Sequence, residues 1–254
     1  MTDFPQAIVP VDHVEPVPRR IRAVLDGRVV IDTTAAIYVW EWSFYPKYYV
    51  PIDDFAPGAL VDEGHEEHLR RGTARWHGLQ SGDRVLAGTA HHYLSSDVER
   101  ITGTVRVDWA AVDHWFEEDE EVFVHPRNPY TRVDALRSER EVVVGRDGRL
   151  LARSSHPVLV FETGPPTRYY GDRLDVDSPR LVPSDTVTSC PYKGTTSTYW
   201  RVVTGGRVEP DLAWAYDVPT RQPLSIAGLG ALYNEKVDLT VDGTRIDRPV
   251  TSCS

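Results

Sequence analysis

A short segment in the second half of the chain brings a thiol, a phenol and an amine together. Cys190, Tyr192 and Lys193 lie within four residues, directly before Gly194. A thiolate is the nucleophilic form of cysteine, and a nearby ammonium group favours it. A lysine removed from water can instead act as a base or form a Schiff base. The segment therefore predicts nucleophilic chemistry through Cys190 or Lys193.

The same segment also has a purely structural interpretation. Free cysteine is among the most buried residue types, so Cys190 can be a small core residue. Pro191 would then interrupt a strand edge and Lys193 would be a surface charge. Titration of the thiol distinguishes the two interpretations, because only a reactive thiolate at neutral pH favours an enzyme.

Further residues of the second half complete the predicted site. Glu162 is a candidate acid or base, and Tyr199 can donate a hydrogen bond to a developing oxyanion. Arg168 can bind a ligand carboxylate or phosphate through two parallel hydrogen bonds, or it can form an internal ion pair. Trp214 and Tyr216 alternate along an expected strand, as core residues or as an aromatic wall. The predicted ligand-binding residues are Arg168, Tyr170, Asp175, Tyr192, Trp214 and Tyr216.

The chain repeats itself at an offset of 121 residues. Asp26-Gly27-Arg28 recurs as 147–149, Glu41 recurs as Glu162, and Tyr48-Tyr49 recurs as 169–170. This period is too long for a solenoid unit and predicts two tandem domains of one fold. We expect an irregular, proline-rich arm over residues 1–19, a first domain over 20–125 and a second over 126–254.

The reactive segment is unevenly conserved between the two copies when their glycines are aligned. With Gly78 placed on Gly194, His77 takes the position of Lys193 and Ala74 that of Cys190. We therefore expect the first domain to have lost the chemistry and the second to carry the site. The corresponding place in the first domain should be filled, blocked or differently polar.

Local patterns favour β-strands. Short β-branched and aromatic runs alternate with 19 prolines and 18 glycines, and Asp26-Gly27 and Asp147-Gly148 are typical of tight hairpin turns. The clearest helical signal covers residues 108–116, with Asp108 as its cap. The sequence predicts a mainly β protein: two tandem copies of a small antiparallel β-rich domain, each with at most one short helix.

The composition of the chain limits the classes of partner that the protein is expected to bind. A net charge of −10 argues against binding to nucleic acid or to an anionic membrane surface. No apolar run is long enough to span a bilayer, and the N-terminus lacks the pattern of a signal peptide. Two cysteines make no disulfide framework, which favours a reducing cytoplasm. No dinucleotide fingerprint and no histidine–cysteine metal pattern occurs, so we expect a small-molecule ligand with no cofactor and no metal. The oligomeric state stays open.

Several motifs resemble one protein family. They are His125-Pro126-Arg127, Arg132-Val133-Asp134, Phe161-Glu162-Thr163-Gly164, Arg168-Tyr169-Tyr170, Cys190-Pro191-Tyr192-Lys193-Gly194, Ala213-Trp214-Ala215-Tyr216 and Tyr233-Asn234-Glu235. The chain resembles the DUF427 family in its tandem two-copy form, over nearly everything after about Arg19. The resemblance implies a compact β-rich fold and a shared site, but no activity. The family has carried a nucleotidyltransferase-like label, yet the chain has no paired-aspartate metal motif and no phosphate-cradling glycine loop.

These observations together predict a small-molecule enzyme, a cofactor-independent hydrolase or lyase with its site in the second domain. One alternative is a non-catalytic ligand-binding module with an aromatic pocket. Another is a scaffold whose acidic surface recognises a protein partner. Activity of the nucleotidyltransferase type rests on the family label alone.

Overall fold

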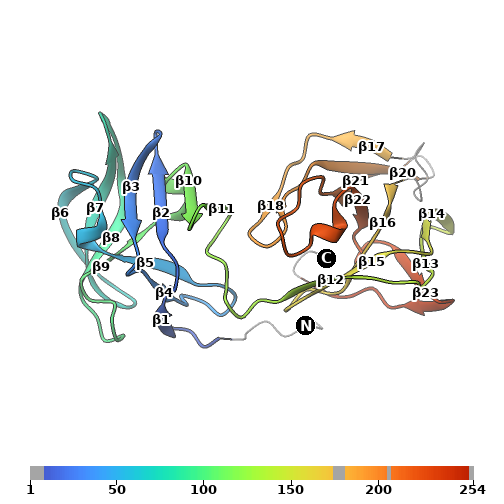
Figure 1. Ribbon diagram of the computed structural model, residues 1–254, viewed down its shortest axis with the longest axis horizontal. Helices are drawn as coiled ribbons and strands as arrows, with labels where there is room; N and C mark the ends of the chain where they lie inside the picture. Colours follow the sequence, from blue (N-terminus) through green and yellow to red (C-terminus); the bar gives the residue numbers. More distant parts are fainter. Residues whose placement is uncertain (1–8, 174–180, 205–206, 252–254) are drawn as a thin grey trace. The chain divides into compact units, whose positions relative to one another are not determined.

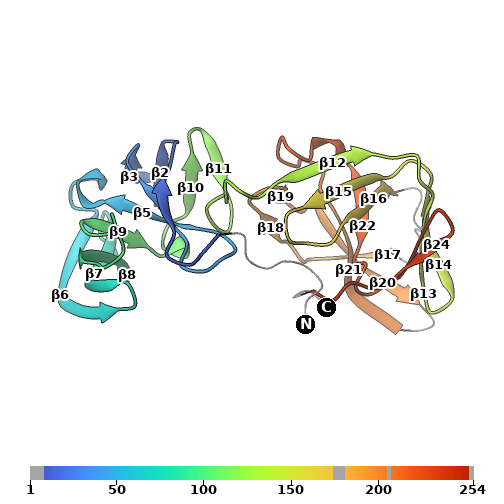
Figure 2. The same cartoon turned by 90° about the horizontal axis from the view of Figure 1, so that it is seen from below.

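The computed structural model describes residues 9–173, 181–204 and 207–251 of the chain. The predicted ligand-binding residue Asp175 lies outside these residues. The chain divides into two compact units, whose boundary falls between Asn128 and Pro129. Figures 1 and 2 show both units as β-structures, and no helix in the described ranges is both long and apolar enough to cross a membrane.

The first domain contains a seven-stranded and a four-stranded antiparallel sheet. The larger sheet has the order β1-β4-β5-β9-β8-β7-β6 and the smaller the order β11-β10-β2-β3. The elements are β1 (Val14–Pro16), β2 (Ile21–Leu25), β3 (Arg28–Thr33), β4 (Ile37–Val39), β5 (Lys47–Pro51), η1 (Ile52–Asp54), β6 (Leu60–Leu69), β7 (Gly72–Ser81), β8 (Arg84–Ser95), β9 (Thr104–Val107), η2 (Trp109–Ala111), β10 (His114–Glu117) and β11 (Glu120–Val122).

The second domain repeats this plan. Its larger sheet has the order β12-β15-β16-β22-β21-β20-β17 and its smaller sheet the order β14-β13-β23-β24. A small two-stranded sheet, β18-β19, is added. The elements are β12 (Val133–Arg137), β13 (Val142–Arg146), β14 (Arg149–Ser154), β15 (Val158–Glu162), β16 (Arg168–Asp172), β17 (Leu181–Ser184), β18 (Ser189–Cys190), β19 (Gly194–Thr195), β20 (Thr198–Thr204), β21 (Arg207–Ala215), η5 (Leu224–Ile226), β22 (Leu229–Leu232), β23 (Asp238–Val241) and β24 (Thr244–Ile246).

The two larger sheets match strand by strand, and so do the two smaller ones. The predicted fold class, two tandem antiparallel β domains, is therefore confirmed. The predicted hairpin turns also have the expected geometry. Asp26 and Gly27 have φ values of 49° and 71°, and Asp147 and Gly148 have 51° and 72°. Positive φ at both central residues is the requirement of a type I′ turn, which matches the twist of the strands it joins.

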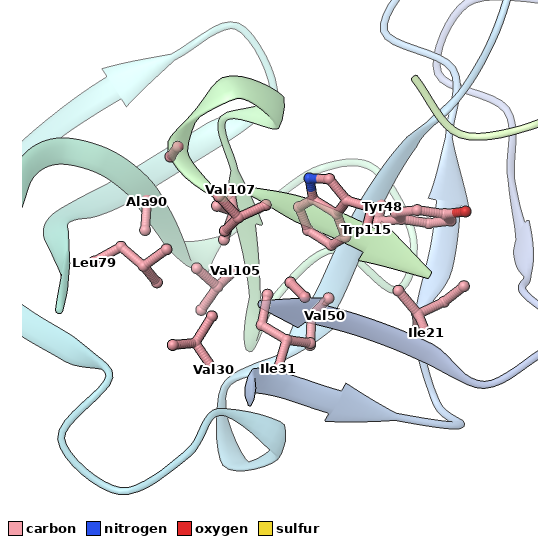
Figure 3. Close-up of a cluster of buried hydrophobic side chains, with 14 of the residues drawn as sticks. Ile21, Val30, Ile31, Tyr48, Val50, Leu79, Ala90, Val105, Val107 and Trp115 are labelled. Carbon is pink, nitrogen blue, oxygen red and sulfur yellow. The ribbon is translucent and has the colours of Figure 1, made fainter. Parts of the chain in front are cut away.

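The main core of the first domain lies between its two sheets. Ile21, Ile31 and Trp115 from the smaller sheet are buried against side chains of the larger one, including Val50 and Val105. Figure 3 shows these side chains together with others of the same cluster. The second domain has an equivalent cluster with Val142, Val144, Leu212, Leu232 and Leu239 among its buried members. Burial of these side chains holds the sheets together.

The outer face of each larger sheet carries a second, smaller cluster of buried residues. In the first domain it contains Ile37, Val39, Tyr49, Ala74, Tyr93 and Ile101. In the second domain it contains Val133, Val158, Val160, Tyr170, Tyr199, Trp214, Tyr216, Ile226 and Ala231. Tyr48 belongs to the main core and Tyr49 to the outer cluster, because successive strand residues point to opposite faces.

Two local predictions were wrong. Residues 108–116 do not form a helix, since only Trp109–Ala111 makes a 3-10 turn and β10 follows. Trp115 is buried between the sheets and packs on Trp109 with ring centroids 5.1 Å apart, so tertiary packing decides the conformation. The N-terminal arm is also not irregular throughout, because Val14–Pro16 pairs with β4 at the edge of the larger sheet.

Strand β6 forms the other edge of the first domain's larger sheet. Most of its side chains are exposed, and many are acidic. Its pairing with β7 shifts register between Asp62 and Glu66. Gly64 lies inside this shift with φ of 67°, and its amide donates to Asp62 Oδ1 at 2.8 Å. The strand is therefore bulged, with a local twist.

Candidate functional site

The predicted site residues come from the outer face of the second domain's larger sheet. Four of its strands place one residue each in a row across the sheet: Tyr170, Ala231, Trp214 and Tyr199. The matching row of the first domain is Tyr49, Arg106, His91 and Trp76. These registers give a residue-by-residue correspondence between the two sites that does not depend on sequence alignment.

The strand registers correct the expected alignment of the reactive segment. His77 lies on β7, whose counterpart in the second domain is β20. By the strand registers, His77 is equivalent to Trp200 and not to Lys193. The segment with Cys190 belongs to a hairpin tip, where Cys190 pairs with Gly194. At the matching tip of the first domain, Leu69 pairs with Gly72. Arg71 therefore corresponds to Lys193, and the first domain has retained a cation at this position.

Lys193 forms a nearly buried ion pair at this tip. Its Nζ donates to Glu162 Oε1 at 2.5 Å, and the side chains of Lys193 and Glu162 are 14% and 6% exposed. Burial by itself disfavours the ammonium form, but the Glu162 carboxylate outweighs this effect and holds the pKa of Lys193 above its ordinary value. Lys193 is therefore a fixed ammonium at neutral pH, which argues against its action as a base or a Schiff-base nucleophile.

Cys190 lies in the same electrostatic neighbourhood. Cys190 is partly buried and forms no disulfide, and it lies close enough to Lys193 and Tyr216 to influence the pKa of both side chains. Burial raises the pKa of Tyr216, and nearby Tyr170 and Cys190 raise it further. The structure therefore places Cys190, Lys193, Glu162, Tyr170 and Tyr216 near one another.

Arg168 is engaged inside the protein. Its Nη1 and Nη2 donate to Glu235 Oε2 and Oε1 at 2.5 and 2.7 Å, and Nη1 also reaches Asn234 Oδ1 at 3.1 Å. The guanidinium lies 5.8 Å and 5.5 Å from the ring centroids of Trp214 and Tyr233. Burial favours the neutral acid of Glu235, but Arg168 outweighs it and lowers the pKa of that carboxyl. Arg168 thus makes the bidentate contact that the sequence predicted for a ligand, with Glu235 as its acceptor.

The aromatic residues pack on one another under the hairpin tip. Trp214 Nε1 donates to Tyr170 OH at 3.0 Å, and the Tyr199 hydroxyl lies 3.0 Å from Thr188 Oγ1 and 3.4 Å from Tyr233 OH. Trp214 and Tyr216 are buried, so both serve the core in this conformation. Tyr192 is half-buried against the same cluster, and its carbonyl accepts from Thr220 Oγ1.

A groove of about 200 Å³ lies at the inner face of the same sheet. Trp200, Leu181 and Leu232 line it together with Arg173, whose guanidinium lies 5.5 Å from the Trp200 ring. The strand registers match Gly230 in this groove to the fully buried Val105 of the first domain. Glycine in the second domain leaves open a space that the side chain of Val105 fills in the first domain.

The first domain has a more polar outer face. Tyr49 OH donates to Glu41 Oε1 at 3.0 Å, and Arg106 Nε donates to the same oxygen at 3.2 Å. Arg106 Nη1 donates to Asp108. Burial lowers the pKa of Lys47, and the charge of Arg106 lowers it further. The counterpart of the predicted site therefore differs in polarity from the second domain and retains ionisable groups.

Five histidines of the first domain lie on three strands of its larger sheet. His65 and His68 lie on β6, His77 on β7, and His91 and His92 on β8. Across residues 9–173, 181–204 and 207–251, no three His, Cys, Asp or Glu side chains gather in a way that could hold a metal ion. Burial lowers the pKa of His91, and the charge of Arg106 lowers it further. Burial also lowers the pKa of His92, with a smaller effect from His77 in the same direction.

Sequence reasoning missed three residues of the site. Glu235 and Asn234 bind Arg168, and Tyr233 packs on Trp214 with ring centroids 4.4 Å apart. All three directly follow β22. Because β22 runs antiparallel to β16, they lie beside Arg168, the first residue of β16. They form one of the motifs shared with the DUF427 family, and an acidic residue there was a possible signal for the partner of a buried arginine.

Comparisons with known proteins support the two-domain repeat but do not indicate an activity. A comparison with curated proteins finds no match. The family model described as a domain of unknown function, DUF427, matches residues 13–118 and again residues 134–243. Each match covers one of the two β domains, and together they cover most of the chain. The chain therefore belongs to the DUF427 family and carries two copies of its domain.

Proposed function

We propose that the second domain is a cofactor-independent hydrolase that uses Cys190 as its nucleophile. The observation that carries the proposal is the fixed ammonium of Lys193, held by Glu162 beside the Cys190 thiol. A nearby cation favours a thiolate, which is the nucleophilic form. A lyase that forms a Schiff base through Lys193 is less well supported, because that reaction needs a neutral amine.

In this proposal the Cys190 thiolate attacks an electrophilic carbon, such as a carbonyl, and expels a leaving group. Water then cleaves the acyl-enzyme, which releases an acid and restores the thiol. Lys193 compensates the negative charge that develops on the substrate oxygen. Tyr199 on β20 and Tyr216, directly after β21, are the candidate hydrogen-bond donors. A reducing cytoplasm, the expected location, would keep Cys190 available as a thiol.

The experiment compares the alkylation rates of the two cysteines at neutral pH by mass spectrometry of peptides. We expect iodoacetamide to modify Cys190 about ten-fold faster than Cys253. Lys193→Gln should remove this advantage, whereas Lys193→Arg should retain part of it. p-Nitrophenyl acetate, an activated ester, should give a burst of nitrophenol and an acetyl group on Cys190.

Two outcomes would overturn the proposal. One is an alkylation rate of Cys190 no greater than that of Cys253. The other is ester cleavage that is unchanged in Cys190→Ala. Leu69 occupies the corresponding position in the first domain and packs on the outer cluster, so an inert Cys190 would be explained as a packing residue.

A ligand-binding module without catalysis is the second candidate, and the groove beside Trp200 favours it. Its volume of about 200 Å³ suits a small molecule, and Arg173 over the Trp200 ring supplies a charged and an aromatic contact. Gly230→Val would refill the space. If this candidate is correct, a small molecule that co-purifies with the wild-type protein should be absent from the Gly230→Val variant.

A further inference from the structure

Two buried ring nitrogens on the outer face of the first domain have no hydrogen-bond partner among the described residues. They are Nε1 of Trp76 and Nε2 of His91. The two residues lie directly opposite each other on β7 and β8, with ring centroids 4.3 Å apart. An indole N–H can only donate, so Trp76 requires an acceptor atom. Buried polar groups are nearly always paired, so two unpaired neighbours need an explanation.

The fold does not impose these unpaired nitrogens, because the second domain satisfies the same two positions. Trp214 replaces His91, and its Nε1 donates to Tyr170 OH. Tyr199 replaces Trp76, and its hydroxyl is bonded to Thr188. In the first domain the hydroxyl of Tyr49, the counterpart of Tyr170, donates to Glu41 instead. The unpaired nitrogens are therefore a property of the first domain's own side chains.

Positive charge lies on the same face of the sheet as these nitrogens. Arg106 is directly opposite His91 on β9, but Glu41 and Asp108 already bind its guanidinium. Lys47 points to the same face, two residues before Tyr49 on β5. Its Nζ lies 5.3 Å from the Tyr45 ring centroid and has no carboxylate within 4 Å among the described residues. Lys47 is thus a partly buried cation that makes no ion pair with a described carboxylate, although Glu41 and Asp108 act on it from farther away.

We propose that this face of the first domain binds a small monocarboxylate. Its oxygens accept hydrogen bonds from Trp76 Nε1 and His91 Nε2, and Lys47 with Arg106 compensates its charge. A single negative charge fits better than the double charge of a phosphate, because Glu41, Asp108 and Glu67 also act on this site. His65 lies 6.0 Å from the Trp76 ring, so an aromatic group attached to the carboxylate would find ring contacts.

Benzoate binding to the full chain, measured by calorimetry, tests the proposal. Trp76→Phe keeps an aromatic side chain and deletes the indole N–H donor, and His91→Phe keeps an aromatic side chain and deletes the imidazole nitrogens. Each should weaken benzoate binding about ten-fold, as expected for loss of a hydrogen bond to a charged acceptor. Trp115→Phe is the matched control, because Trp115 Nε1 donates to Trp109 O in the core between the sheets. Its benzoate affinity should equal that of the wild type.

Thermal unfolding of the free protein gives a second readout of opposite sign. Trp76→Phe removes a donor without a partner, so the melting temperature should stay the same or rise. Trp115→Phe removes a satisfied hydrogen bond, so its melting temperature should fall. A benzoate affinity that is equal in the wild type and in Trp76→Phe would overturn the proposal. So would tighter binding of inorganic phosphate than of benzoate, or a fall in melting temperature for Trp76→Phe as large as that for Trp115→Phe. Since all these variants lie in the first domain, their outcome is independent of Cys190.

Discussion

Lys193 of the second domain and Arg71 of the first occupy corresponding positions, each directly before a glycine with positive φ. Lys193 reaches the carboxylate of Glu162. Arg71 reaches the main-chain oxygen of Glu41 at 3.0 Å and forms an ion pair with Asp12 at 2.7 Å. Both domains therefore anchor the same hairpin tip to the end of the same strand with a cation, while the carboxylate partner differs.

The first prediction concerns the ion pair of Lys193. Glu162→Gln should lower the free energy of unfolding by about 3 kcal/mol, because it leaves a nearly buried ammonium without its counter-charge. The double variant Glu162→Gln/Lys193→Met should recover most of this loss. Urea denaturation of the single and double variants measures the coupling. Equal stability of Glu162→Gln and the wild type would show that the pair is solvated and weak.

The second prediction concerns Arg168, which donates from two nitrogens to Glu235. A lysine can present only one point charge to the carboxylate, so Arg168→Lys should cost about 2 kcal/mol of stability. Lys47→Arg is the matched exchange in the first domain and should cost less, because no carboxylate of the described residues lies within 4 Å of Lys47 Nζ. Denaturant midpoints compare the two variants. A larger loss for Lys47→Arg would contradict this reasoning.

The third prediction separates two glycines at corresponding hairpin tips. A Cβ atom on Gly72 would lie 1.9 Å from the main-chain oxygen of Ser95, and φ there is 137°. Gly72→Ala should therefore destabilise the first domain by about 3 kcal/mol or more. Gly194 has φ of 91° but no atom closer than 3.5 Å to such a Cβ, so Gly194→Ala should cost only about 1 kcal/mol. Thermal unfolding gives the ranking, and equal losses would refute it.

The fourth prediction concerns pH. Burial lowers the pKa of His125 to about 4, and its ring stacks on Tyr45 with centroids 3.6 Å apart. The ordinary pKa of histidine is 6.5, and this value applies in the unfolded chain. Between pH 6.5 and pH 4, His125 therefore binds a proton in the unfolded chain but not in the folded protein. As the pH falls through this window, titration of His125 therefore lowers the free energy of unfolding by up to about 3 kcal/mol.

His125→Phe retains the stacking on Tyr45 and removes the titrating group. Its stability should consequently fall less steeply than that of the wild type between pH 6.5 and 4, with parallel curves above pH 7. Urea denaturation at a series of pH values measures both curves. Parallel curves throughout the acid range would mean that His125 titrates normally in the folded protein.

Sequence periodicity predicted the parts of the fold that contain no insertion. The stretch from Asp26 to Asp54 matches its repeat without a gap, and the predicted Asp-Gly turn is present at the start of this stretch in both domains. Alternation along a strand also placed Trp214 and Tyr216 on one face, where both are buried. The pattern alone left their role open, because core residues and pocket walls share it.

The alignment of the reactive segment failed for a physical reason. In the first domain β6 and β7 form one long hairpin with a bulge, whereas β17 and β20 of the second domain are separated by the small sheet β18-β19. Glycine matching cannot detect such a shift in register. The partner of Arg168 was missed because Glu235 lies 67 residues away in sequence, and only the pairing of β16 with β22 brings the two together.

The bulge of β6 has a consequence for the behaviour of the protein at high concentration. An outer strand offers unpaired amides and carbonyls to any passing chain, and long flat strands of this kind recruit copies of themselves into aggregates. The kink at Gly64 and the acidic side chains beside it make β6 a poor template for such recruitment. Replacement of Glu66 and Glu67 by valine, together with removal of the kink, should turn this rim into a nucleation point for fibrils.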